Sequence, residues 1–133
     1  MKLNIILEPG DGEMWGRIDA PNTLLTTVGN NANEVTQSLK ELIQDHLDNE
    51  GKEQQFWQNV KVENITFEYV YDLTAIFDVI SAVKINSLAD LAGINQSLMR
   101  QYASGVKYPS AQQAQKIQVA VKQLGEKLLQ ISM

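Results

Sequence analysis

The stretch LADLAGINQSLMRQYASG, residues 88–105, decides the fold of the C-terminal part of the chain. Residues 87–92 and 96–103 each fit a short helix, and a tight turn around Gly93 separates them. Two short helices joined by such a glycine-containing turn form a helix-turn-helix. Ala89 is small enough to let the two helices cross closely, and Gly93 tolerates the positive φ that the turn requires. The spacing therefore predicts a helix-turn-helix centred on Gly93.

The second predicted helix, residues 96–103, separates its apolar side chains from its polar ones. Asn95 is its expected N-cap, and Gly105 is expected to end it. The predicted core that the two helices share contains Leu88, Ala92, Ile94, Met99 and Tyr102. The predicted outer face carries the polar residues Gln96, Ser97, Arg100, Gln101 and Ser104.

Two further helices are predicted to flank the motif. Residues 73–80 fit a short helix, and residues 110–130 fit a long one with Ser110 as its N-cap. The long helix has four apolar residues on one side, namely Ile117, Val121, Leu124 and Leu128. Its last apolar residues, Leu128, Leu129 and Ile131, extend beyond a minimal fourth helix. We expect this end to cover the N-terminal module or to pair with a second subunit.

Residues 88–105, with Lys107, Pro109 and Ser110 after them, resemble the helix-turn-helix of the Cro and phage-repressor type. The resemblance extends over about residues 73–130. It implies that the second helix lies in the major groove of double-stranded operator DNA, and that two subunits bind half-sites about 34–36 Å apart. Because the same geometry also serves as plain packing, a protein-interaction module with a degenerate helix-turn-helix stays an alternative.

The hydrogen-bonding groups on base edges and phosphates suggest DNA partners for most outward residues of the motif. Gln96 and Gln101 could each form a bidentate contact to adenine, and Arg100 could form one to guanine. Ser97 is expected to contact a base or a phosphate. Phosphate contacts, which position the protein without specifying sequence, are expected from Asn95, Lys107 and Tyr108.

The N-terminal part of the chain has the pattern of a small sheet with one helix. Alternating apolar residues over 3–7 and 14–18, separated by the turn Pro9-Gly10-Asp11-Gly12, predict a hairpin. A third strand is expected at 24–28, a helix at 31–47 with Asn31 as N-cap, and a fourth strand at 65–71. Residues 52–61 show no clear periodicity. The predicted fold class is α+β, with a β-β-β-α-β module over 1–72 and an all-helical module over 73–133.

Charge and composition separate the two modules. The chain has 133 residues and a formal charge of −5. Residues 1–72 carry five bases and thirteen acids, whereas residues 73–133 carry six bases and three acids. A basic module can approach phosphates, and an acidic one can dock a basic protein. No cysteine, secretory signal or membrane-length apolar stretch is present, so we expect a cytoplasmic binding protein without a disulfide, metal or cofactor.

Together, the two modules resemble the HicB antitoxin family. The resemblance is carried by the hairpin from Leu3 to Asp11-Gly12, by Trp15, and by the helix pattern over residues 33–47. It implies a partial ribonuclease-H-like module that binds a small basic, HicA-like, mRNA-cleaving toxin, and a DNA-binding module that represses the operon as a homodimer or larger assembly. The first choice for toxin contact is the acidic patch Asp45, Asp48, Glu50 and Glu53. A stand-alone transcriptional regulator is the alternative.

An enzymatic function finds little support in the sequence. Two-metal phosphodiester cleavage needs carboxylates that converge on ions roughly 3.5–4 Å apart. The acids around the first hairpin (Glu8, Asp11, Glu13, Asp19), together with Glu41, Asp45 and Glu68, do not clearly point to one place. We therefore expect no catalytic residues. The single histidine, His46, is expected at the surface or in edge packing of its helix.

Overall fold

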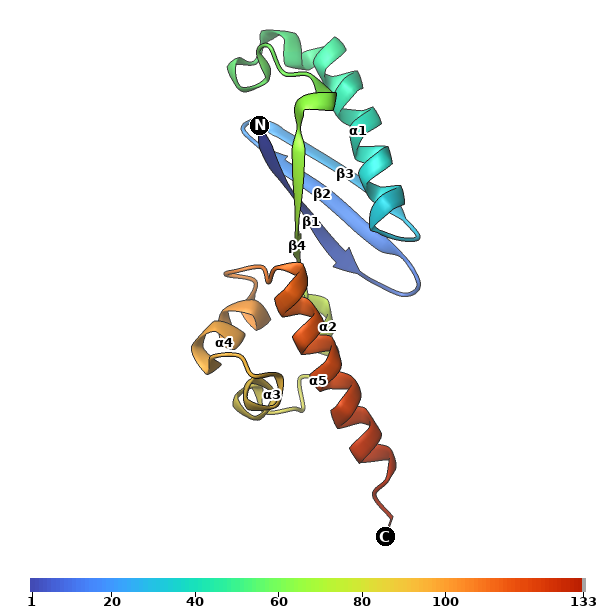
Figure 1. The fold of residues 1–133 in the computed structure, drawn as a ribbon, viewed down its shortest axis with the longest axis vertical. Helices are drawn as coiled ribbons and strands as arrows, with labels where there is room; N and C mark the ends of the chain where they lie inside the picture. Colours follow the sequence, from blue (N-terminus) through green and yellow to red (C-terminus); the bar gives the residue numbers. More distant parts are fainter. Residues whose placement is uncertain (133) are drawn as a thin grey trace. The chain divides into compact units, whose positions relative to one another are not determined.

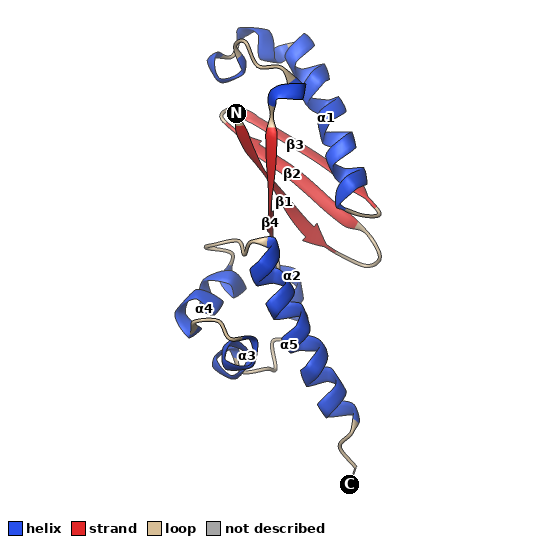
Figure 2. Cartoon of the chain, in the orientation of Figure 1, coloured by secondary structure: helices blue, strands red, loops and turns tan. Residues whose placement is uncertain are grey.

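The chain is an α+β protein with two compact units. In the computed structural model, which describes residues 1–132, the units are Met1–Val70 and Tyr71–Met133 (Figures 1 and 2). The division lies two residues before the boundary predicted after Asp72. The first unit contains the sheet and one long helix, and the second contains only helices.

A four-stranded sheet forms the first unit. Its strands are β1 (Lys2–Pro9), β2 (Met14–Ala20), β3 (Thr23–Gly29) and β4 (Thr66–Tyr71), in the order β3-β2-β1-β4. The first three strands pair antiparallel. β4 begins beside the start of β1, where Thr66 N–H donates to the carbonyl of Met1 at 2.8 Å. β3 and β4 are therefore the two edges of the sheet.

Helix α1 (Ala32–Asp48) covers one face of this sheet (Figure 1). Its buried residues include Val35, Leu39 and Ile43, which pack against the inward side chains of the strands, such as Ile5 and Leu7. All five are fully buried. Burying one such side chain stabilises the fold by about 1.5–3 kcal/mol, so this layer holds the unit together.

The N-terminus of α1 is capped as predicted. The side chain of Asn31 accepts from Glu34 N–H at 2.9 Å. The Glu34 carboxylate in turn accepts from Asn30 N–H at 2.7 Å, one residue earlier than in the usual capping box. One unpaired backbone donor of the first helical turn and one just before the helix are thereby satisfied.

The expectation that His46 lies at the surface was wrong, because the residue is only 8% exposed. Three short 3₁₀ turns, Glu50–Glu53, Gln55–Trp57 and Val62–Asn64, occupy the region without clear periodicity and fold back over the end of α1. The Trp57 ring lies edge-on to the imidazole, with 5.5 Å between ring centroids. A Cβ on Gly51 would lie 2.8 Å from the His46 carbonyl, so only glycine allows this approach.

The second unit packs four helices around one core. They are α2 (Thr74–Val79), α3 (Ile85–Ala92), α4 (Gln96–Ser104) and α5 (Ala111–Leu129). The core contains buried residues from all four helices and the segments beside them: Leu73, Phe77, Leu88, Ala89, Ile94, Met99, Tyr102, Ile117 and Ala120. Of the five residues predicted for the shared core, four are buried and Ala92 is partly buried.

The expected apolar side of α5 is only partly correct. Ile117 is buried and Val121 and Leu124 are half-buried, but Leu128 is 55% exposed. The second core position belongs to Ala120, which is small enough to sit against α3. Ser110 caps the helix as predicted, since its hydroxyl accepts from Gln113 N–H at 3.3 Å.

Gly16→Ala is expected to destabilise the first unit by about 1–3 kcal/mol, because a Cβ there would collide with the buried Cγ1 of Val35. Urea unfolding followed by tryptophan fluorescence measures this unit alone, since Trp15 and Trp57 are the only two tryptophans. Gly10→Ala is the matched control, because its Cβ would have only an ordinary contact to Trp15 at 3.9 Å. Equal stability of both variants would contradict the packing described here.

Candidate nucleic-acid interface

The helix-turn-helix is built around one close helix crossing. Ala89 is completely buried in α3, and Gly93 ends that helix in the left-handed conformation with φ 71°. The Ile94 N–H then donates to the Ala89 carbonyl at 2.9 Å, which ties the turn to α3. Asn95 caps α4 as predicted, because its side chain accepts from Leu98 N–H at 3.1 Å. Both ends of the turn are thereby held by hydrogen bonds.

The predicted outer residues lie on the solvent side of α4. Ser97, Arg100 and Ser104 are exposed, whereas Gln96 and Gln101 are half-buried. On the opposite side of the helix, Met99 and Tyr102 fill the core. The structure therefore separates the two faces of α4 in the way the sequence pattern predicted.

The predicted phosphate-contacting residues flank this outer face. Asn95 is exposed at the start of α4, Lys107 is exposed after its end, and Tyr108 is half-buried. The loop that carries Lys107 is held in place, because the Gln101 carbonyl accepts from the N–H groups of Val106 at 3.0 Å and Lys107 at 3.3 Å. Gly105 ends α4 in the left-handed conformation, with φ 80°, and so allows the chain to turn back into this loop.

Two hydrogen bonds from α3 orient the outer side chains of α4, and sequence analysis missed both. Arg100 Nη1 donates to Asn86 Oδ1 at 2.6 Å. Gln96 Nε2 donates to Asp90 Oδ1 at 3.1 Å. The partners are 14 and 6 residues apart in the chain, so no helical spacing within one element could have indicated them.

These bonds leave the base-reading capacity of both side chains available. A guanidinium has five N–H donors, and Asn86 takes one. The Gln96 amide retains its oxygen and its second N–H, which are the acceptor and donor that a bidentate contact to adenine requires. Because Asn86 and Asp90 restrict the rotamers of these groups, less conformational entropy remains to be lost on binding.

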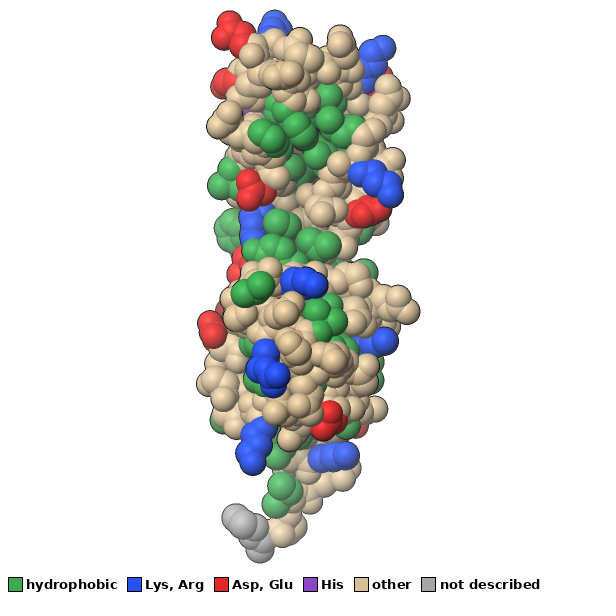
Figure 3. All heavy atoms as spheres, turned by 90° about the vertical axis from the view of Figure 1, so that its left-hand side faces the viewer, with side chains coloured by type: hydrophobic (Ala, Val, Ile, Leu, Met, Phe, Trp, Pro, Cys, Tyr) green, Lys and Arg blue, Asp and Glu red, His purple; other side chains and the backbone are tan. Residues whose placement is uncertain are grey.

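The surface around α3 and α4 is mostly uncharged and polar. Figure 3 shows this face of the second unit, with a few basic and acidic side chains dispersed among polar groups and backbone. Its cations therefore supply moderate, not dominant, attraction to phosphates, and selectivity has to come from polar side chains such as those of α4.

The four acids predicted for toxin contact lie at the end of α1 and on the turn that follows it. Asp45 and Asp48 lie on the last turn of α1, and Glu50 and Glu53 lie on the 3₁₀ turn that follows. All four are exposed. Carboxylates at a helix C-terminus oppose the helix dipole, so α1 gains no stability from this placement. Hydrogen bonds to Asn49 and Gln44 occupy one oxygen each of Asp45 and Asp48.

The buried polar cluster beneath this patch is a structural network. His46 Nε2 lies 2.8 Å from Gln54 Oε1 and 3.4 Å from Thr23 Oγ1. Thr23 Oγ1 accepts from Trp57 Nε1 at 3.1 Å, and both the Pro21 carbonyl at 3.1 Å and Gln54 Oε1 at 3.2 Å lie within reach of its proton. The network thereby attaches the 3₁₀ segment to the sheet.

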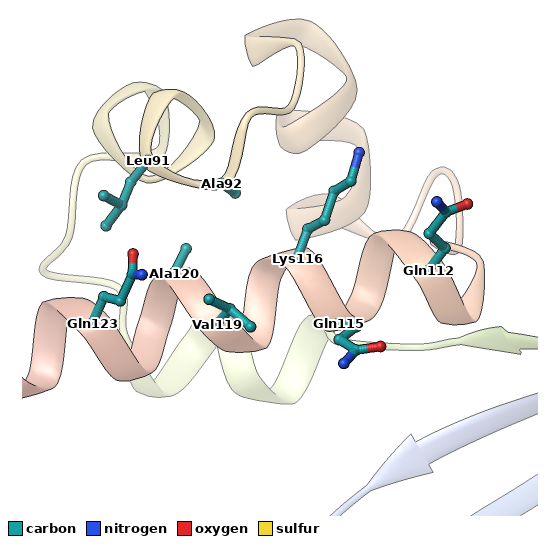
Figure 4. Close-up of a pocket in the computed structure, with 8 residues that line it drawn as sticks. All are labelled: Leu91, Ala92, Gln112, Gln115, Lys116, Val119, Ala120 and Gln123. Atoms are coloured by element: carbon teal, nitrogen blue, oxygen red, sulfur yellow. The ribbon is translucent and has the colours of Figure 1, made fainter.

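A pocket lies in the second unit, and the described residues contain no metal-ligating group. A cavity of about 340 Å³ lies between α3 and α5 and is lined by short apolar side chains, glutamines and Lys116 (Figure 4). Over residues 1–132, no three His, Asp or Glu side chains come together in a way that could hold a metal ion. Two of the carboxylates considered above form ion pairs, namely Glu8 on β1 with Arg17 and Glu68 on β4 with Lys2.

Comparison of the chain with protein-family models, with curated proteins and with solved structures found no match. None of the described helices combines the length and apolar character that crossing a membrane requires.

Asn95→Ala is expected to destabilise the second unit by about 1 kcal/mol, because it removes the side-chain acceptor for Leu98 N–H. Asn95→Ser, which retains a capping oxygen, should cost clearly less. Thermal unfolding followed by far-UV circular dichroism compares the two variants. Equal losses would show that the cap does not set the start of α4.

Proposed function

We propose that this protein is a DNA-binding repressor, and that α4 lies in the major groove of its operator. One observation carries the proposal: the outward side chains of α4 are polar and at least partly exposed, two of them (Gln96 and Arg100) are held by α3, and the inward side chains build the core. Such an arrangement meets the two requirements of direct readout, which are donors and acceptors that reach base edges and a rigid support for them.

The chemistry of the outer face suits base edges better than it suits a protein partner. Protein interfaces bury apolar and aromatic anchors at their centre. The face of α4 offers Gln96, Ser97, Arg100 and Gln101 instead. These side chains can pair with adenine and guanine in the major groove, and Lys107 at the rim can contact phosphate. This contrast favours DNA over the protein-interaction alternative.

We further propose that the chain is an antitoxin of HicB type, whose first unit binds a small basic toxin in the cytoplasm. The excess of acids in residues 1–72 and the four exposed carboxylates at the end of α1 support this proposal. Because carboxylates at a helix C-terminus oppose the helix dipole, these four residues do not stabilise α1. Binding of a basic partner is therefore a better explanation for their presence. The local hydrogen bonds of Asp45 and Asp48 favour the alternative, a regulator without a toxin.

Arg100→Ala is expected to lower affinity for a duplex from the protein's own promoter by about 1–3 kcal/mol and to relax the preference at one base pair. Lys107→Ala, the charge-matched control, should weaken binding to specific and random duplexes alike. Fluorescence anisotropy at fixed salt measures both. An equal loss for Arg100→Ala on the two duplexes would contradict base readout by this side chain.

Asn86→Ala provides a second control, because it leaves Arg100 intact but removes its support. It should weaken binding to the promoter duplex in the same direction as Arg100→Ala and add little when the two changes are combined, since both act on one contact. Full additivity of the two losses would show that Asn86 does not position Arg100.

The antitoxin proposal predicts a stable complex with the product of a small basic open reading frame adjacent to the gene. Co-expression should rescue growth, and the two proteins should co-purify. Replacing Asp45, Asp48, Glu50 and Glu53 by their amides should weaken the complex at low salt. The same replacements at four other exposed acids, namely Asp11, Glu13, Glu41 and Glu63, should not. Normal growth and no co-purification in the wild type would favour the stand-alone regulator.

A further inference from the structure

Strand β3 forms an edge of the sheet that is exposed along most of its length, although Thr23 at its start is buried against the 3₁₀ segment. It is the terminal strand in the order β3-β2-β1-β4, and it pairs with β2 over all seven residues from Thr23 to Gly29. Among residues 1–132, no strand lies on its other side. Alternate N–H and C=O groups along this edge therefore face away from the sheet, as in any antiparallel edge strand.

The sequence and pairing of the strand itself lack the features with which proteins usually protect such an edge. Its sequence, TLLTTVG, contains no charged residue and no proline. Its pairing with β2 is continuous, so no bulge twists it away. An unprotected edge of this length is a template for another strand.

The sheet face opposite α1 presents apolar side chains at this same edge. Leu24 is 64% exposed and Val28 is 40% exposed. On β2, the residue directly across from Val28 is Trp15, which is 49% exposed. Thr26, between the two apolar residues, is also exposed. The open edge thus carries an apolar strip that no part of the first unit covers.

We propose that β3 pairs antiparallel with β3 of a second copy of this chain, about a two-fold axis through Thr26. This register is the only symmetric one that pairs all seven residues, and it places Leu24 of each copy opposite Val28 of the other. Trp15 and Val28 of one copy and Leu24 of the second then form one continuous apolar row across the joined sheet.

Charge and side-chain orientation are compatible with this register. Because β3 has no charge, pairing brings no like charges into direct opposition, although each copy carries an acidic first unit. A shift of one residue would pair exposed positions with inward-facing ones, and a shift of two would set Leu24 opposite Thr26. The strand is therefore more complementary to itself in this register than in any neighbouring one. The pairing does not depend on DNA or toxin binding.

Sedimentation equilibrium of the full chain tests the pairing. The wild type should show about twice the monomer mass of 14.9 kDa at micromolar concentration. Thr26→Lys places two lysines face to face and should raise the dissociation constant at least about tenfold or give monomers. Thr66→Lys, at an exposed position of the other edge strand, should leave the dimer intact. Circular dichroism establishes that both variants are folded.

A cysteine cross-link fixes the register independently. The natural chain has no cysteine, so Thr26→Cys introduces a single thiol that meets its own copy across the axis. Mild oxidation should convert this variant to a covalent dimer on a denaturing gel, whereas Thr66→Cys should form no covalent dimer. A monomeric wild type, or a Thr26→Lys variant that dimerises as tightly as the wild type, would overturn the proposal. If the wild type is monomeric, the edge of β3 remains free to pair with a strand of another protein.

Discussion

The helix-turn-helix depends on the close packing of α3 against α4, around a core in which Ala89 is completely buried. A larger side chain there would push the helices apart, and the turn at Gly93 could no longer close onto the Ala89 carbonyl. The same crossing brings Asn86 and Asp90 within hydrogen-bond distance of Arg100 and Gln96. The core and the polar outer face of α4 are thus two results of a single packing constraint.

The two units combine different kinds of stabilisation. The second unit relies on an apolar core and well-capped helices. The first adds a buried polar network in which Thr23, His46, Gln54 and Trp57 satisfy one another. Such networks hold their members in fixed positions only when every donor and acceptor is paired, and in the described residues no buried side-chain nitrogen or oxygen lacks a partner. The segment after α1 is thereby held in place without any regular secondary structure of its own beyond short turns.

The features that sequence predicted are those set by local rules. Alternation of apolar residues placed the strands, and capping residues such as Asn31, Asn95 and Ser110 placed the starts of three helices within a residue. The 3₁₀ turns after α1 lack periodicity, and their folding back is what buries His46. The bond between Arg100 and Asn86 joins residues that only the tertiary crossing brings together. Local pattern therefore indicated which residues face outward, but not which neighbours position them.

Methylation protection of the protein's own promoter tests most directly whether α4 reads the major groove. Dimethyl sulfate modifies guanine N7 in the major groove and adenine N3 in the minor groove, so one experiment examines both grooves. The account predicts that the bound protein protects guanine N7 at discrete positions, leaves adenine N3 reactive, and loses protection at one guanine when Arg100 is replaced by alanine. Binding without N7 protection, or protection confined to adenine N3, would contradict it.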